Sequence, residues 1–352
     1  MKKHYLFKVI VAFFSSLFFL FHIFSSVAVA SVESFPEITG ASHAYVYNFE
    51  SNKVVFSKGA GDVKIAPAST VKIMSGLVAL EYLSDRQDEY VTLTKEMLQG
   101  VEGYTVNLSY GETLKIKDLL YGLICGGGND AAIAIAVICA GSVEEFVNKM
   151  NDTAAAFGMK DTFYTNPTGI DDPKMRTTLN DTVIISKKAI DNELFVKMSS
   201  ANSHSYTLKN SGETRTVANR NGLISSYSAI GYQNKKVKGL NAGMTDAGGY
   251  CVSAYAESGQ DSYLCIIMGG IETSSGKIMS YTNANLLLSY YFSNYTYTKI
   301  AEKNDSVGEI TVELALPTNG GQAVVVDCII ENDIYAFAPS GIDYKKDLTY
   351  KT

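Results

Sequence analysis

The 352-residue sequence predicts an α/β protein in which an antiparallel sheet is flanked by helices. Residues 41–57 contain two alternating strands on either side of the turn Glu50–Lys53, which is the pattern of a hairpin. Residues 237–269 contain three more strands with glycine turns, which is the pattern of an antiparallel meander. Most helical stretches lie between these two regions. Residues 296–352 return to strands, so we expect a small β-rich C-terminal domain after a boundary near residue 295.

The N-terminus has the three parts of a secretory signal peptide. These are the positive Lys2, Lys3 and Lys8, the apolar residues 9–24, and the small-residue cleavage site Ala28–Ala30. We therefore expect residues 1–30 to be removed and residues 31–295 to form an exported main domain. An apolar run retained as a membrane anchor is the alternative, and it also places the rest of the chain outside the cytoplasmic membrane.

Charge and histidine content exclude several classes of function. The formal net charge of −6 becomes −9 once the three lysines of the signal are removed, so we expect no nucleic-acid partner. Of four histidines, His43 and His204 remain after the signal, and neither lies near a nucleophile motif. A Ser-His-Asp hydrolase and a histidine-rich zinc site are therefore not expected, and we predict no cofactor.

The five cysteines show no spacing typical of a metal site. They are Cys125, Cys139, Cys251, Cys265 and Cys328. We expect buried free thiols, because most of them stand in apolar runs. A disulfide between Cys251 and Cys265 on adjacent strands is the alternative that export would permit.

Residues 67–83 predict the central helix of the protein. Apolar residues recur at helical spacing after Pro67 and lie on nearly every face, so the helix should be buried almost all round from about Ala68 or Ser69. A serine at a helix start is ordinary, but Lys72 stands where a capping box would place an acidic residue. Burial and the helix dipole both disfavour its charged form and lower its pKa.

A neutral amine one turn from a hydroxyl is a general base beside a nucleophile, so Ser69 and Lys72 form a candidate catalytic pair. The alternative is a capped core helix whose lysine extends to solvent. Spacing alone does not decide, since Ser274 and Lys277 repeat it elsewhere in the chain.

Three glycines, Gly126–Gly128, predict a tight turn between two buried helices. Asn129 and Asp130 follow and should cap a helix over residues 131–140. The glycines are not a phosphate loop, because no Gly-Lys-Ser/Thr follows. Either this is an ordinary capped junction, or Asn129 is presented into a cleft.

The remaining elements follow from periodicity. We expect helices at 115–121, 143–157, 181–189, 193–198 and 283–294, a turn-rich loop at 163–172, strand and loop at 203–224, and strands at 308–316, 323–330 and 334–338. In the meander, Asn241–Gly243 ends a strand where a ligand could approach the backbone closely. A plain glycine hairpin is the alternative there.

The order of these stretches resembles the D-alanyl-D-alanine carboxypeptidases among the penicillin-binding proteins. The resemblance covers about residues 41–294. It is carried by P-A-S-T-V-K-I-M at 67–74, N-D-A-A at 129–132, F-G-M-K-D-T at 157–162, N-P-T-G-I-D-D at 166–172, T-D-A-G-G-Y-C at 245–251 and N-A-N-L-L-L at 283–288.

The resemblance implies a two-lobed fold of the β-lactamase/transpeptidase type, with an antiparallel sheet in one lobe and a mostly helical second lobe. It implies that Ser69 attacks the terminal D-Ala-D-Ala bond of a peptidoglycan stem peptide while Lys72 takes its proton. Asn129 would hold Lys72 and the substrate amide. The N–H groups of Ser69 and Met244 would form the oxyanion hole.

Two positions depart from the family pattern. The family's Ser-x-Asn is Gly127–Asn129 here, and its Lys-Thr-Gly is Asn241–Gly243. A proton-relay hydroxyl and the cation and hydroxyl that face the substrate carboxylate are therefore missing. Arg220 and Thr245 are the candidates to replace them.

Other functions and attachments remain open from the sequence. The departures fit a non-catalytic penicillin- or peptidoglycan-binding homologue, while a β-lactamase is disfavoured because no Glu-x-x-Leu-Asn lies between Asn129 and Asn241. The resemblance implies β-lactams as covalent inhibitors and a place in the cell envelope. Membrane association would require an uncleaved N-terminus or a C-terminal helix that this sequence does not contain.

Overall fold

The computed structural model describes residues 35–226, 231–314 and 322–342, and the chain divides into two compact units. Residues 36–293 form the main unit. The second unit contains residues 294–352 and is described separately below. The expected signal peptide lies outside the described residues.

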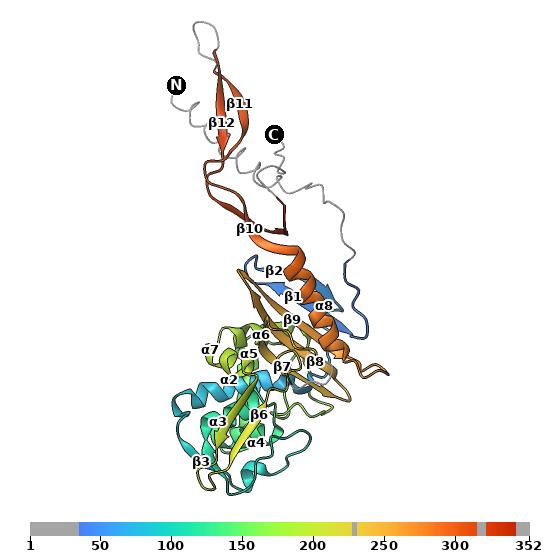
Figure 1. Ribbon diagram of the computed structural model, residues 1–352, viewed down its shortest axis with the longest axis vertical. Coiled ribbons are helices and arrows are strands. Elements are labelled where there is room, and N and C mark those ends of the chain that lie inside the picture. Colours follow the sequence, from blue (N-terminus) through green and yellow to red (C-terminus); the bar gives the residue numbers. More distant parts are fainter. Residues whose placement is uncertain (1–34, 227–230, 315–321, 343–352) are drawn as a thin grey trace. The chain divides into compact units, whose positions relative to one another are not determined.

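A five-stranded antiparallel sheet with strand order β2-β1-β9-β8-β7 forms the base of the main unit (Figure 1). Its strands are β1 (His43–Asn48), β2 (Lys53–Lys58), β7 (Val237–Thr245), β8 (Gly249–Ser258) and β9 (Asp261–Gly270). Val46 lies opposite Cys265, so the predicted hairpin and meander join between β1 and β9. The predicted antiparallel sheet is confirmed.

Helices cover both faces of this sheet. Alternate residues of a strand point to opposite faces. Tyr263 of β9 packs edge-on against Phe292 of α8 (Met279–Asn294), with ring centroids 4.7 Å apart. Met268, on the other face of β9, has its sulfur 3.7 Å from the hydroxyl of Thr182 in α6 (Leu179–Ile190). The sheet therefore lies between α8 and the helices that include α6.

The helical part of the main unit surrounds α2 (Val71–Leu83), which follows a 3₁₀ turn at Ala68–Thr70. Around it pack α3 (Ile116–Ile124), α4 (Asn129–Ala140), α5 (Val143–Ala156), α6 and α7 (Glu193–Ser200). Ile73, Met74 and Leu83 have no exposed surface, and most other residues of α2 are buried too. The predicted all-round burial of this helix is confirmed.

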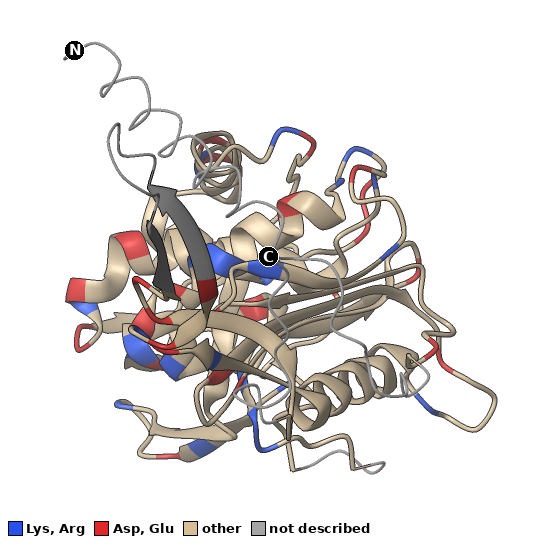
Figure 2. Ribbon diagram, turned by 90° about the horizontal axis from the view of Figure 1, so that it is seen from above, with Lys and Arg blue, Asp and Glu red and all other residues tan. Residues whose placement is uncertain are grey.

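Short elements complete the main unit. The strand pairs are β3 (Tyr90–Thr92) with β4 (Thr113–Lys115), and β5 (Ser203–Thr207) with β6 (Thr214–Ala218). Single 3₁₀ turns lie at Ser84–Arg86 and Glu96–Leu98. Acidic and basic residues are interspersed along the ribbon (Figure 2), as on an ordinary solvated surface.

The second unit is β-rich, as its sequence predicts. It pairs β10 (Tyr295–Ala301) with β13 (Ile334–Pro339), and β11 (Ser306–Leu314) with β12 (Gln322–Ile329). Strand β10 was not predicted, because it begins directly after the last residue of the predicted helix at 283–294. No helix among the described residues has the length and apolar character needed to cross a membrane.

One sequence prediction is wrong in detail, and one alternative is excluded. Asn129 is not a helix cap: α4 begins at Asn129, after Gly128, and no side chain caps it. Cys251 and Cys265 are buried free thiols, as expected, and do not form the alternative disulfide. They are not opposite one another, because Cys265 pairs with Ala254 and Cys251 pairs with Gly243.

We predict that the stability of the main unit depends on the core face of α2. Ile73→Ala should lower the free energy of unfolding by about 2–5 kcal/mol, because it removes a fully buried side chain. Ile271→Ala is the matched control, since Ile271 is 55% exposed. Urea unfolding of both variants checks this, and equal losses would contradict the central position of α2.

Candidate functional site

Ser69 and Lys72 lie together where the 3₁₀ turn passes into α2. The Lys72 Nζ lies 3.3 Å from the Ser69 Oγ and 2.5 Å from the carbonyl oxygen of Thr168. Lys72 is 1% exposed, so this amine does not extend to solvent. Ala68, just before the serine, has φ +49°, a left-handed conformation that is uncommon for alanine and that strained functional turns often contain.

Burial sets the charge of Lys72. Desolvation is the largest cause, and the positive charge of Arg220 adds to it, so that the pKa of Lys72 falls to about 7. The carboxylate of Asp130 opposes this shift. Near neutral pH a substantial fraction of the amine is therefore unprotonated and can accept a proton from Ser69.

Strand β7 passes directly beside the serine. A side chain at Gly243 would collide with Ser69, since its Cβ would lie 2.5 Å from the Oγ. Asn241 is buried, and its side-chain oxygen has no hydrogen-bond partner in the described structure. Met244 is exposed, and the Thr245 hydroxyl accepts a hydrogen bond from the Gly248 N–H.

Asn129 is the first residue of α4, a helix that packs against α2. Its backbone N–H donates to the Tyr104 carbonyl and its side-chain amide donates to the Glu102 carbonyl at 2.7 Å. Its side-chain oxygen is buried without a partner. The hydrogen bonds recorded for Lys72 go to Ser69 and Thr168, so the expected support of Lys72 by Asn129 is supplied by Thr168 instead.

The loop at 166–170 contributes the contact that the sequence did not reveal. The Asn166 side-chain oxygen accepts N–H bonds from Thr168 and Gly169, which fixes the Thr168 carbonyl toward Lys72. Gly169 has φ +85°, and a Cβ there would strike the Ala68 carbonyl. A carbonyl ligand carries no side-chain signature, so the conspicuous Asn-Pro-Thr-Gly turn was the available signal.

Arg220 is the cation whose charge lowers the pKa of Lys72. Its guanidinium stacks over the ring of Tyr104, 4.2 Å from the centroid. Gly127, with φ +65°, lies against it, and a Cβ at that position would come within 3.3 Å of the Arg220 side chain. Gly127, the position where the family has a serine, therefore lies next to Arg220.

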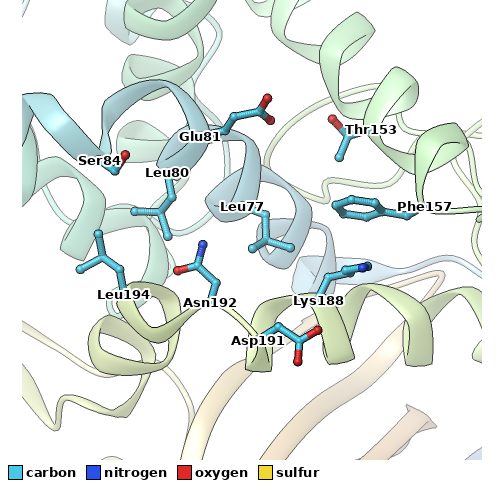
Figure 3. A pocket seen from close by; sticks show the side chains of 10 residues that line it. All are labelled: Leu77, Leu80, Glu81, Ser84, Thr153, Phe157, Lys188, Asp191, Asn192 and Leu194. Carbon is cyan, nitrogen blue, oxygen red and sulfur yellow. The ribbon is translucent and has the colours of Figure 1, made fainter.

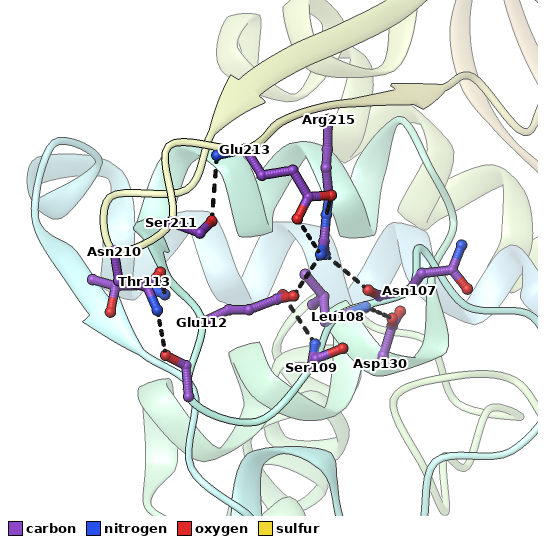
Figure 4. Close-up of polar contacts among 11 residues, drawn as sticks. Asn107, Leu108, Ser109, Glu112, Thr113, Asp130, Asn210, Ser211, Glu213 and Arg215 are labelled. Atoms are coloured by element: carbon purple, nitrogen blue, oxygen red, sulfur yellow. Dashed lines mark hydrogen bonds and ion pairs between the residues drawn. The ribbon is translucent and has the colours of Figure 1, made fainter.

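The loop that carries Tyr104 is held firmly. The Asp130 carboxylate accepts N–H bonds from Val106 and Leu108. Arg215 pairs with Glu112 at 2.7 Å and donates to the Asn107 carbonyl (Figure 4). These contacts fix Tyr104, and so Arg220, relative to α4.

A pocket of about 300 Å³ opens beside Gly243. Its lining includes Tyr104, Arg220, Met244, Tyr250, Ile278 and Tyr281. A second hollow lies along the later turns of α2, between Leu77, Phe157, Lys188 and Leu194 (Figure 3), and no predicted site residue lines it. Among the described residues no cluster of three or more His, Cys, Asp or Glu side chains could hold a metal.

Solved structures share this fold. Penicillin binding protein 6B from Escherichia coli matches with a TM-score of 0.66 and 24% identity, over 90% of this chain and 89% of that one. A D-alanyl-D-alanine carboxypeptidase from Mycobacterium tuberculosis matches with a TM-score of 0.64 and 26% identity, over 76% and 96%. The predicted fold of the β-lactamase/transpeptidase type is confirmed, and the molecule has the fold of a penicillin-binding protein.

The chain belongs to the D-alanyl-D-alanine carboxypeptidase family, whose model matches residues 29–272. It is 29% identical to D-alanyl-D-alanine carboxypeptidase DacF of Bacillus subtilis over 78% of this chain and 67% of that protein. It is also 29% identical to DacD of Escherichia coli, over 69% and 61%. The chain thus matches about two thirds of the length of these relatives, and the predicted family is confirmed.

We predict that the reactivity of Ser69 depends on the absence of a side chain at position 243. Gly243→Ala should slow covalent labelling by a fluorescent penicillin by about 100-fold, because a shift of about 1 Å at a reacting atom has that effect. Gly212→Ala is the control, since its φ of +73° adds backbone strain while its Cβ would meet no atom within 4 Å. Unchanged labelling of Gly243→Ala would contradict the close approach of β7.

Proposed function

We propose that the protein is a serine-type D-Ala-D-Ala carboxypeptidase that removes the terminal D-alanine from peptidoglycan stem peptides through an acyl-enzyme on Ser69. The observation that carries this proposal is the buried Lys72 amine, 3.3 Å from the Ser69 hydroxyl and with a pKa lowered to about 7. That arrangement is a nucleophile with its base.

The proposed reaction has two steps. The Ser69 Oγ attacks the penultimate carbonyl while Lys72 takes the hydroxyl proton, and the N–H groups of Ser69 and Met244 stabilise the oxyanion. The protonated Lys72 returns a proton to the leaving nitrogen, and D-alanine departs. Water then hydrolyses the ester and restores the Ser69 hydroxyl. The unpartnered oxygen of Asn129 is available to accept the substrate's amide N–H.

Arg220 supplies the charge that the third motif lacks. It lines the pocket beside Gly243 and can pair with the terminal carboxylate of the substrate. A charge-assisted hydrogen bond of this kind contributes about 1.5–3 kcal/mol. Asn241 adds an amide that can hydrogen-bond the same carboxylate. The lost hydroxyls at positions 127 and 242 make the turnover slow rather than absent.

The proposed setting follows from the family and the N-terminal sequence. Residues 1–30 act as a signal peptide, residues 31–295 as the catalytic domain and residues 296–352 as part of a β-rich domain. The exported protein acts in the cell envelope on peptidoglycan, and β-lactams acylate Ser69 as substrate mimics. An uncleaved N-terminus or a C-terminal helix would attach it to the membrane.

A non-catalytic peptidoglycan-binding protein is the second candidate, favoured by Gly127 and by the Asn241–Ala242 replacement. It predicts stem-peptide binding without turnover. A β-lactamase is the weaker third candidate, and rapid penicillin hydrolysis would support it.

We predict that Ser69→Ala abolishes both D-alanine release from diacetyl-Lys-D-Ala-D-Ala and covalent penicillin labelling. Ser274→Ala is the matched control, because Ser274 and Lys277 share the spacing but lie in an exposed turn. Mass spectrometry of the penicillin adduct and an assay of free D-alanine check this. Wild-type protein with no more D-alanine release than Ser69→Ala, yet with peptide binding, would establish the non-catalytic alternative.

The rate of acylation should depend on pH through Lys72. Since the neutral amine is the base, kcat/KM should rise about tenfold per pH unit below pH 7 and level off above it. Arg220→Gln removes a positive charge that lowers this pKa, so the acidic limb of its kcat/KM profile should move to higher pH. Arg220→Lys keeps the charge, so its acidic limb should stay near that of the wild type. A limb that does not move in Arg220→Gln would contradict the electrostatic coupling.

A further inference from the structure

The pocket beside Gly243 is lined by five large apolar or aromatic side chains, three polar ones and three small residues. Met244, Ile278 and three tyrosines are the large side chains, Asn219 and Ser225 are polar, and Gly243 lies between the pocket and the Ser69 side chain. Arg220 is the one charged side chain among the described residues that line it. A pocket of this composition binds an apolar group and orients it by a single charge.

The aromatic wall is fixed before any ligand binds. The Tyr250 hydroxyl donates to Glu272 at 2.5 Å. The Tyr281 ring lies 5.1 Å from that of Tyr232, whose hydroxyl accepts the Ile278 N–H. Tyr104 is stacked on Arg220. Since these side chains are held by their neighbours, the volume of the pocket is a property of the free protein.

The position of Arg220 orients the substrate. The C-terminal carboxylate is the anionic end of the peptide, so pairing it with Arg220 places the leaving residue in this pocket. The side chain of that residue would then share the pocket with Ile278 and Tyr281, which line it. A methyl group fills only part of about 300 Å³, a volume at the lower end of the range for drug-sized ligands.

We propose that this pocket accepts a terminal D-amino acid with a large apolar or aromatic side chain, such as D-leucine or D-phenylalanine, in addition to D-alanine. The inference rests on the proposed function, because it uses the same acyl transfer from Ser69. Water hydrolyses the bond between the penultimate D-alanine and the terminal residue, and the larger D-amino acid is released with a new carboxylate on the shortened peptide. No further reactant is needed.

The test compares diacetyl-Lys-D-Ala-D-Ala with the peptides that end in D-Leu and D-Phe. We expect kcat/KM for D-Phe release to equal or exceed that for D-Ala release. Ile278→Phe, which fills the pocket, should lower the D-Phe to D-Ala ratio by about tenfold or more, the usual effect of a steric change in an apolar pocket. Ile271→Phe makes the same exchange at an exposed position outside the pocket and should leave the ratio unchanged.

Binding separates this inference from the proposed function. Calorimetric titration of Ser69→Ala, with its folding checked by thermal melting, should show tighter binding of the D-Phe peptide than of the D-Ala peptide. A D-Ala peptide bound at least tenfold more tightly would overturn the inference, as would an Ile278→Phe ratio equal to that of the wild type. If the wild-type protein turned over no peptide, the proposed function would fail and this titration would still decide the pocket's preference.

Discussion

The structure depends on keeping one amine out of water. Transfer of a charged ammonium into an apolar interior costs far more than a protein can recover from packing, so a buried lysine gives up its proton or finds acceptors. Lys72 does both: its pKa falls to about 7, and Thr168 and Ser69 lie within hydrogen-bond distance. The all-round burial of α2 is therefore what makes Lys72 a base.

That burial requires three separate segments to meet at one helix start. Strand β7 approaches at Gly243 and the 166–170 loop at Gly169, while α4 packs against α2. Any Cβ at the first two positions would strike the turn that carries Ser69. Close backbone contact leaves little freedom for the nucleophile, so its geometry is set before substrate arrives. The unpartnered oxygens of Asn129 and Asn241 are the groups left for a substrate to satisfy.

The sequence was sufficient to predict the features that depend on periodicity and on local chemistry. The sheet strands, the buried helix and the Ser69–Lys72 pair followed from alternation, helical spacing and a misplaced lysine. It could not predict the Thr168 carbonyl or the contact between Arg220 and Tyr104, because these depend on how distant segments pack. The sequence analysis misassigned Asn129 as a helix cap, because the capping rule considers only the local backbone. In the structure the Asn129 side-chain amide donates to the Glu102 carbonyl of a distant loop. The sequence could not exclude the alternative Cys251–Cys265 disulfide, because strand register is set by tertiary packing.

In the proposed mechanism Arg220 has two effects: it binds the substrate carboxylate, and its charge lowers the pKa of the base Lys72. Substrate binding therefore changes the base. In the free protein its charge lowers the Lys72 pKa. In the proposed complex the substrate carboxylate neutralises much of that charge, so the pKa of Lys72 should rise when substrate binds. The pH limb of kcat, which reports the bound state, should then lie above that of kcat/KM, which reports the free enzyme. A rise in pKa makes Lys72 a stronger base for the Ser69 proton and a poorer donor to the leaving amine. The absence of a relay hydroxyl at Gly127 therefore matters most in the second half of acylation, when Lys72 alone must return the proton.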